Sequence, residues 1–112
     1  MRIEKNFELL PNIKSAGIIL RPSSPELKEI YLKIKELFQK ADIEILLEDN
    51  SANMISLKGI PLNDLCRKVD FLISVGGDGT LLSVVRKSFK YDKAVLGINR
   101  GTLGFLTDIS ME

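Results

Sequence analysis

The chain has 112 residues, 45% of them hydrophobic, which is enough for one domain with a hydrophobic core. Its 16 basic and 15 acidic residues nearly cancel, which argues against binding of nucleic acids or membrane surfaces through bulk charge. The absence of histidine excludes Ser-His-Asp and Cys-His catalysis, and any histidine-ligated zinc, within this chain.

Two features indicate where the protein resides. Cys66 is the single cysteine, so no internal disulfide can form, and a reducing cytoplasm fits this composition. The N-terminus lacks the apolar core of a signal peptide, and no stretch approaches the length that spans a membrane. We therefore expect a cytoplasmic protein with no nucleic-acid partner and no membrane partner.

The first half of the chain predicts two strands joined by a helix. Residues 15–20 form the first predicted strand, and Ser24 and Pro25 then supply an N-cap and a first helical position. Charged residues fill much of one side of the helix that follows, which predicts an amphipathic helix packed on the core. Residues 43–47 form the second predicted strand. The apolar face of the helix consists of Leu27, Ile30, Tyr31, Ile34, Leu37, Phe38 and Ala41.

The second half continues this alternation. Residues 48–59 are polar and irregular, and they predict a mobile surface loop. A short helix is predicted over residues 61–68, and a buried strand over residues 71–75. A further helix begins after Thr80 and leads to a fourth strand over residues 94–98. Strands that alternate with helices predict an α/β fold, with an open, mostly parallel sheet flanked by helices.

The most informative segment is Gly-Gly-Asp-Gly-Thr at residues 76–80, which joins a buried strand to a helix. Glycines remove the side chains that would keep a phosphate away from backbone N–H groups, and a helix N-terminus adds unpaired donors and a partial positive charge. Asp78 is the unusual member, because a carboxylate beside phosphates needs a metal ion or a proton to accept. This combination predicts phosphoryl transfer, with Asp78 facing an acceptor hydroxyl or a phosphate-bound Mg²⁺.

The segment differs from two other glycine-rich patterns that bind phosphate. It lacks the Gly-Lys-Ser/Thr ending of the P-loop and the third glycine of the dinucleotide-binding pattern Gly-x-Gly-x-x-Gly. A simpler interpretation is a tight turn in which Asp78 caps the helix. Three glycines around one aspartate, between a strand and a helix, favour the phosphate site over that interpretation.

A second segment makes the prediction more specific. The strand over residues 94–98 runs directly into Asn-Arg-Gly-Thr-Leu-Gly-Phe at residues 99–105. If the sheet is parallel, both loops open at the same edge, where open α/β sheets bind ligands. The two motifs, in this order and context, resemble those of NAD kinases, Gly-Gly-Asp-Gly-Thr and Asn-x-Gly-x-Leu-Gly-Phe. The residues that match the second motif are Asn99, Gly101, Leu103, Gly104 and Phe105.

The resemblance implies a phosphofructokinase/NAD kinase-like N-terminal domain, and a reaction in which ATP phosphorylates the 2′-hydroxyl of the adenosine ribose of NAD to give NADP. Asp78 would accept the proton of that hydroxyl or orient it, and Phe105 would lie against the adenine of NAD. Without the family match, Phe105 would be assigned to core packing and Asn99 to a turn. The implied nucleotide-binding residues are Gly76, Gly77, Asp78, Gly79, Thr80, Asn99, Gly101, Leu103, Gly104 and Phe105.

One position departs from the family pattern. Five residues after Asp78, many NAD kinases carry a basic or imidazole side chain that could reach the substrate, whereas this chain has Ser83. Either Arg86 or Arg100 replaces that contact, or the contact is unnecessary here. Arg86 and Lys87 also suit the solvated end of a helix, where the dipole favours positive charge.

NAD kinases continue beyond the second motif into a large, mostly β domain, which is absent from residues 1–112. We therefore expect a single α/β nucleotide-binding domain that is a poor kinase by itself. The expected ligands are ATP as phosphoryl donor, NAD as acceptor and Mg²⁺ as the metal ion. The full-length protein is expected to form homo-oligomers. One alternative is a lipid kinase of the diacylglycerol or sphingosine type, which shares Gly-Gly-Asp-Gly-Thr; a phosphofructokinase is more distant. The other is a standalone nucleotide-binding regulatory module.

Overall fold

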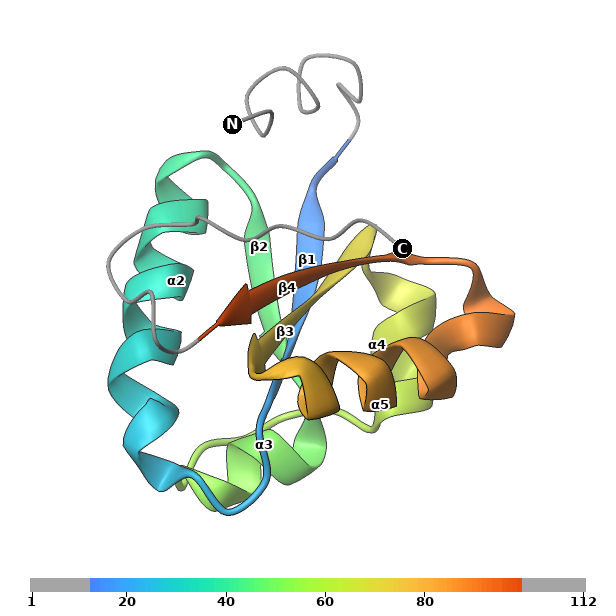
Figure 1. Ribbon diagram of the computed structural model, residues 1–112. Coiled ribbons are helices and arrows are strands. Elements are labelled where there is room, and N and C mark those ends of the chain that lie inside the picture. Colours follow the sequence, from blue (N-terminus) through green and yellow to red (C-terminus); the bar gives the residue numbers. More distant parts are fainter. Residues whose placement is uncertain (1–12, 100–112) are drawn as a thin grey trace.

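The computed structural model describes residues 13–99 of the chain. Four parallel strands form one sheet in the order β2-β1-β3-β4, with helices on both faces (Figure 1). The strands are β1 (Ser15–Leu20), β2 (Glu44–Leu47), β3 (Phe71–Gly76) and β4 (Ala94–Asn99). The helices are α2 (Lys28–Lys40), α3 (Asp49–Met54), α4 (Leu62–Lys68) and α5 (Asp78–Ser88), with short 3₁₀ helices η1 (Pro25–Leu27) and η2 (Phe89–Tyr91). Within residues 13–99, none of the helices is both long and apolar enough to cross a membrane.

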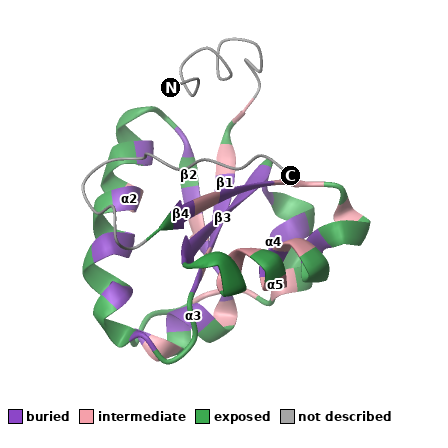
Figure 2. Cartoon of the chain, viewed as in Figure 1, coloured by how far each residue is buried: buried purple, intermediate pink, exposed green. Residues whose placement is uncertain are grey.

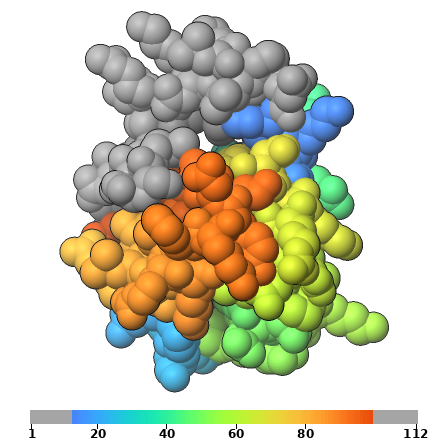
Figure 3. Space-filling model, turned by 90° about the vertical axis from the view of Figure 1, so that its right-hand side faces the viewer, coloured from blue at the N-terminus to red at the C-terminus, as the bar shows by residue number. Residues whose placement is uncertain are grey.

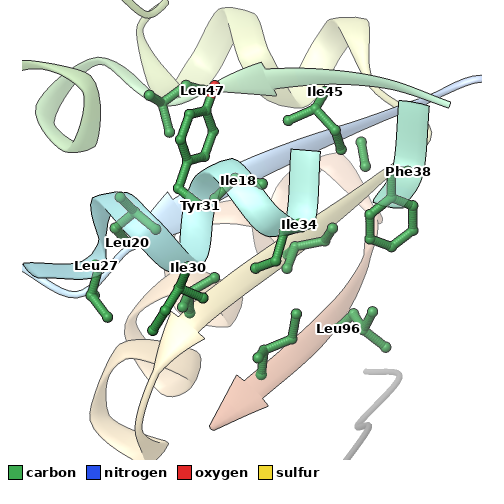
Figure 4. Packing of buried hydrophobic residues seen from close by; sticks show 14 of the residues in the cluster. Ile18, Leu20, Leu27, Ile30, Tyr31, Ile34, Phe38, Ile45, Leu47 and Leu96 are labelled. Carbon is green, nitrogen blue, oxygen red and sulfur yellow. The ribbon is translucent and has the colours of Figure 1, made fainter. Parts of the chain in front are cut away.

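Helix α2 covers one face of the sheet. Alternate residues of a strand point to opposite faces, and Ala16, Ile18 and Leu20 of β1 belong to the cluster on the α2 side. Ile34 and Phe38 of α2 point into the same cluster (Figure 4). Burial of each large aliphatic or aromatic side chain contributes about 1.5–3 kcal/mol. This apolar contact therefore fixes α2 on the sheet.

Helices α4 and α5 cover the opposite face, where they lie side by side (Figure 3). Leu65 of α4 lies over Gly17 of β1, and a Cβ on Gly17 would lie only 2.7 Å from Cγ of Leu65. Leu81 of α5 lies over Gly97 of β4, where a Cβ would lie 3.1 Å from a methyl carbon of Leu81. The two strand glycines thus let both helices approach the sheet closely.

The predicted surface loop over residues 48–59 is wrong, because this segment contains α3. Ser51 and Ala52 of α3 are buried, and Glu48 is its N-cap. The Glu48 carboxylate accepts hydrogen bonds from the N–H groups of Asn50 and Ser51. The polar side chains of this segment therefore satisfy the start of a helix and do not mark an exposed loop.

The first predicted helix also differs in two details. It begins with the 3₁₀ turn η1, and Ser24 precedes that turn without a side-chain hydrogen bond to it; the Ser24 hydroxyl donates to the Pro22 carbonyl at 3.1 Å instead. Leu37 is 62% exposed and Ala41 is exposed, so the buried stripe of α2 is narrower than predicted. In Figure 2, α2 alternates between buried and exposed residues, whereas β3 is buried along its length.

The connections create a switch point between β1 and β3, and they confirm the predicted open parallel α/β sheet. From β1 the chain crosses to β2 on one side, and from β3 it crosses to β4 on the other side. The loops that leave the carboxyl ends of β1 and β3 therefore diverge. Open α/β sheets bind ligands in the crevice that such divergence creates.

The close approach of α4 to β1 can be tested at Gly17. Gly17→Ala should lower the free energy of unfolding by about 1–3 kcal/mol in urea denaturation, because the added methyl group forces the buried Leu65 to move. Gly79→Ala is the matched control, since a Cβ there meets nothing within 4 Å and alanine suits a helix. Equal losses in the two variants would contradict the packing described.

Cys66 provides a second test. It lies buried and free in α4, and burial raises the pKa of its thiol, partly opposed by the positive charges of Lys93 and Arg67. A raised pKa in the folded state stabilises the protein below the unfolded value of about 8.5, and this contribution is lost as pH rises through the folded pKa. The pH midpoint of Cys66 alkylation by iodoacetamide should therefore be higher in the native protein than in urea. Coinciding midpoints would contradict a raised pKa of the buried thiol.

Candidate functional site

The strands that precede the two motifs are parallel neighbours, so their carboxyl ends lie at one edge of the sheet, as predicted. Gly76, the last residue of β3, pairs in register with Asn99, the last residue of β4. Because the strands are parallel, their carboxyl ends lie together, at the arrowheads of β3 and β4 in Figure 1. Residues 76–80 and the segment after Asn99 therefore start from adjacent points.

Gly76 is required by the backbone and by its neighbours. Its φ of 153° lies in the region that favours glycine. A Cβ on Gly76 would also lie 2.8 Å from the Cβ of Arg21 and 2.8 Å from Oγ1 of Thr80. Any other residue here would strain the backbone and collide with the loop that follows β1.

Gly77 and Gly79 have no comparable packing role. A Cβ on either residue would meet nothing within 4 Å. Gly79 also lies inside α5, where glycine destabilises a helix by about 1 kcal/mol relative to alanine. Their missing side chains leave the backbone accessible from solvent, which is what a bound phosphate needs.

The motif itself forms the first turn of α5. The Leu81 N–H donates to the Gly77 carbonyl at 3.1 Å, so the N–H groups of Asp78, Gly79 and Thr80 have no partner inside the helix. Together with the helix dipole, these donors form a site suited to an anion. The helix begins at Asp78 and not after Thr80 as predicted, because the first turn takes in the motif.

Asp78 is exposed at the first position of α5, with Gly77 as the N-cap. No side chain caps this helix, so the simpler interpretation of Asp78 as a cap is wrong. Within residues 13–99 its carboxylate forms no hydrogen bond or ion pair. The carboxylate is therefore available to a ligand on the solvent side of the motif.

A cavity of about 710 Å³ opens beside the motif, at the switch point between β1 and β3. Its walls come from the end of β1 and the loop after it, from α3, from the start of α4 and from one side of α5. This volume is in the range of pockets that hold small ligands. The residues that line the cavity include Arg21, Glu48, Met54, Thr80, Ser83 and Lys87.

Arg21 is a site residue that sequence reasoning missed. It follows β1 directly, and its N–H donates to the Val75 carbonyl of β3 at 2.9 Å. Its Cβ lies against Gly76, as described above. The signal was present in the sequence, since a basic residue at the carboxyl end of a predicted parallel strand belongs to the ligand-binding edge.

The loop after β1 is held in an unusual conformation. Ser23 has a φ of 56°, a left-handed conformation that costs a residue other than glycine about 1–2 kcal/mol. The next residue, Ser24, is buried, and its N–H donates to the thioether sulfur of Met54 in α3 at 3.1 Å. This contact fixes the loop to α3, so both form one wall of the cavity.

A buried hydrogen-bond network connects α3 to β1. Glu48 is only 6% exposed; one carboxylate oxygen accepts from the Asn50 N–H at 2.8 Å, and the other from the Ser51 N–H at 3.0 Å and the Ser51 hydroxyl at 2.8 Å. The Ser51 oxygen in turn accepts from the Leu20 N–H at 2.8 Å. Every one of these polar groups thus has a partner, and the network joins this part of the cavity wall to β1.

The structure brings together only part of the predicted site. Residues 76–80 and Asn99 lie at one edge of the sheet, and Ser83 lines the cavity. Arg86 and Lys87 are both exposed, but only Lys87 lines the cavity. The predicted residues Gly101, Leu103, Gly104 and Phe105, and the alternative contact Arg100, lie outside the described residues.

Residues 13–99 contain no group of three or more His, Cys, Asp or Glu side chains that could hold a metal ion by themselves. A magnesium ion on nucleotide phosphates needs fewer protein ligands, because it keeps several waters and binds one or two carboxylates. The free carboxylate of Asp78 could serve as one such ligand.

A family model described as the ATP-NAD kinase N-terminal domain matches residues 16–112. The chain belongs to the NAD kinase family. It is 54% identical over 100 residues to the NAD kinase of Sulfurimonas denitrificans, with 89% of this chain and 35% of that protein covered. The NAD kinase of Wolinella succinogenes is 50% identical over 103 residues, with 92% and 36% covered. The chain thus spans about a third of the length of these curated relatives.

The network around Ser51 can be tested by mutation. Ser51→Ala should lower the free energy of unfolding by about 1–3 kcal/mol, because the buried Leu20 N–H then loses its acceptor. Asn53→Ala is the control, since Asn53 is an exposed residue of the same helix. Urea denaturation of both variants measures the difference, and an equal effect would show that the network adds no stability.

Proposed function

We propose that this domain belongs to an enzyme that transfers the γ-phosphoryl group of ATP to the 2′-hydroxyl of the adenosine ribose of NAD, giving NADP. One observation carries the proposal: an exposed carboxylate, Asp78, stands among unpaired backbone N–H groups at the start of α5, beside a cavity at the switch point. Positioned donors next to a free carboxylate are what phosphoryl transfer to a hydroxyl requires. The family membership of the chain agrees with this reaction.

The strand order supports separate places for donor and acceptor. The motif leaves β3, which lies between β1 and β4. The cavity opens on the β1 side of the motif and would receive ATP. The segment that follows Asn99 leaves β4 on the other side, and the family resemblance assigns it to NAD. We propose that Gly101, Leu103, Gly104 and Phe105 contact this acceptor, and that Asp78 stands between the two substrates.

The chemistry at Asp78 follows from this placement. Its carboxylate accepts a hydrogen bond from the ribose 2′-hydroxyl and orients the oxygen for in-line attack on the γ-phosphorus. The P–O bond to the β-phosphate breaks as the new P–O bond forms, ADP leaves, and the hydroxyl proton passes to the carboxylate. The N–H groups at the start of α5 stabilise the charge on the transferred phosphoryl group.

Mg²⁺ on the ATP phosphates would be held in part by the Asp78 carboxylate, and it supplies neutralisation of the phosphate charge. Gly77 and Gly79 keep the approach to the backbone open, while Gly76 and Thr80 keep the turn in shape. We further propose that the rest of the protein forms a second, C-terminal domain that completes the cleft and carries homo-oligomer contacts. The free, buried Cys66 supports a cytoplasmic location.

Two alternative functions were open from the sequence: a lipid kinase and a standalone nucleotide-binding module. The relatives described above carry the name NAD kinase. No observation on residues 13–99 favours either alternative.

Asp78→Asn in the full-length gene product tests the role of the carboxylate. The kcat of NADP formation should fall by about 100-fold or more, because the amide cannot take the proton, while the KM for NAD changes little. Asp92→Asn is the matched control: Asp92 is exposed at the C-cap of η2, in a left-handed conformation that asparagine also adopts. Near-normal kcat in Asp78→Asn would remove Asp78 from this role.

A further inference from the structure

Two positive charges line the cavity beside the motif, and neither is explained by the fold. Arg21 follows β1, and Lys87 lies in the last turn of α5. Both side chains are exposed, and neither forms an ion pair within residues 13–99. Cations that converge on one cavity without acidic partners are suited to an anionic ligand.

Helix geometry selects Lys87 over its neighbour Arg86. Residues three and four apart lie on the same side of a helix, and Thr80, Ser83 and Lys87 follow that spacing along the cavity wall. Arg86 does not line the cavity. Lys87 therefore follows Ser83 by one turn, on the side of the helix where this chain lacks the basic contact of the family pattern.

The reach of Lys87 suits a chain of phosphates that begins at the motif. Lys87 is about 12 Å along the helix axis from Gly79. Its flexible stem leans toward the N-terminus of the helix, as helical side chains do, and shortens that separation. A γ-phosphate at the first turn of α5 would leave the α- and β-phosphates on the Lys87 side, with Arg21 at the motif end.

The one carboxylate among the cavity-lining side chains does not oppose an anion there. Glu48 is 6% exposed, and its oxygens accept three hydrogen bonds from Asn50 and Ser51. The negative charge is thus directed into α3 and away from the open space. Glu48 therefore adds no free carboxylate to the cavity.

Part of the remaining wall is apolar, and this part indicates what accompanies the phosphates. Side chains of β1, α3, α4 and α5 contribute Ile19, Met54, Leu62 and Val84. A cavity of about 710 Å³ is larger than a triphosphate needs, and an apolar wall favours a flat base. The cavity therefore suits a nucleoside triphosphate better than an inorganic polyphosphate.

We propose that Lys87 and Arg21 bind the phosphates of a nucleoside triphosphate donor, and that Lys87 takes over the basic contact missing at Ser83. This inference rests on the proposed function only for the identity of the donor. Lys87 is assigned to binding, and Asp78 keeps the chemical role.

The test is equilibrium binding of ATP, and separately of inorganic tripolyphosphate, to the 112-residue chain and the full-length gene product by calorimetry at low salt. Lys87→Ala should weaken ATP binding by about tenfold, because a charge-assisted contact is lost, and Lys87→Arg should restore most of it. Arg86→Ala, which removes the same charge from the neighbouring position, should change binding by less than about twofold. Arg21→Gln should weaken binding as Lys87→Ala does.

Tripolyphosphate should bind more weakly than ATP and lose a similar factor in Lys87→Ala, because it shares the phosphates and lacks the base. Tighter binding of tripolyphosphate than of ATP would overturn the nucleoside assignment. Equal effects of Lys87→Ala and Arg86→Ala, with circular dichroism unchanged, would overturn the role of Lys87, as would absence of ATP binding to both wild-type proteins. Binding that depends on Lys87 without any NADP formation by the full-length gene product would instead reject the proposed function.

Discussion

The close contact at Gly76 is the constraint on which the site depends. The residue ends β3 with a φ of 153°, and its α-carbon faces the Cβ of Arg21 and the hydroxyl of Thr80. Three segments therefore meet at one point: the end of β1, the end of β3 and the first turn of α5. Only a residue without a side chain permits this contact. The contact directs α5 from the sheet edge and places Arg21 beside the motif.

The three glycines of the motif have different physical roles. Gly76 is required by the backbone conformation and by packing. Neither requires glycine at positions 77 and 79, since a Cβ there would meet open space. Glycine inside a helix lowers its stability, and the packing of the fold does not require glycine at position 79. Phosphate binding explains the glycine, because a phosphate can then reach the exposed backbone N–H groups at the start of the helix. This division connects the local geometry to phosphoryl transfer.

The wall that α3 and the end of β1 form is held by hydrogen bonds between buried polar groups. Glu48 and Ser51 satisfy each other, the start of α3 and the Leu20 N–H of β1. Ser24 reaches Met54 and so ties the loop after β1 to the same helix. Contacts of this kind favour a preformed cavity, and preformed sites bind ligands at a lower entropic cost. The site thus combines a hydrogen-bonded wall with an open side that carries Arg21 and Lys87.

The sequence by itself determined the α/β fold, the four strands and the position of the motif at the sheet edge, because short apolar runs and turn glycines are local signals. The polar residues 48–59 were misleading, since the Ser51 hydroxyl is buried against the Leu20 N–H, a partner 31 residues away that only the folded chain brings close. The start of α5 at Asp78 and the placement of Arg21 against Gly76 likewise required the structure. The choice of Lys87 over Arg86 depends on which side of α5 faces the cavity. Contacts between residues far apart in sequence decide the burial of Ser51 and the placement of Arg21 and Lys87 at the cavity, and no local pattern encodes them.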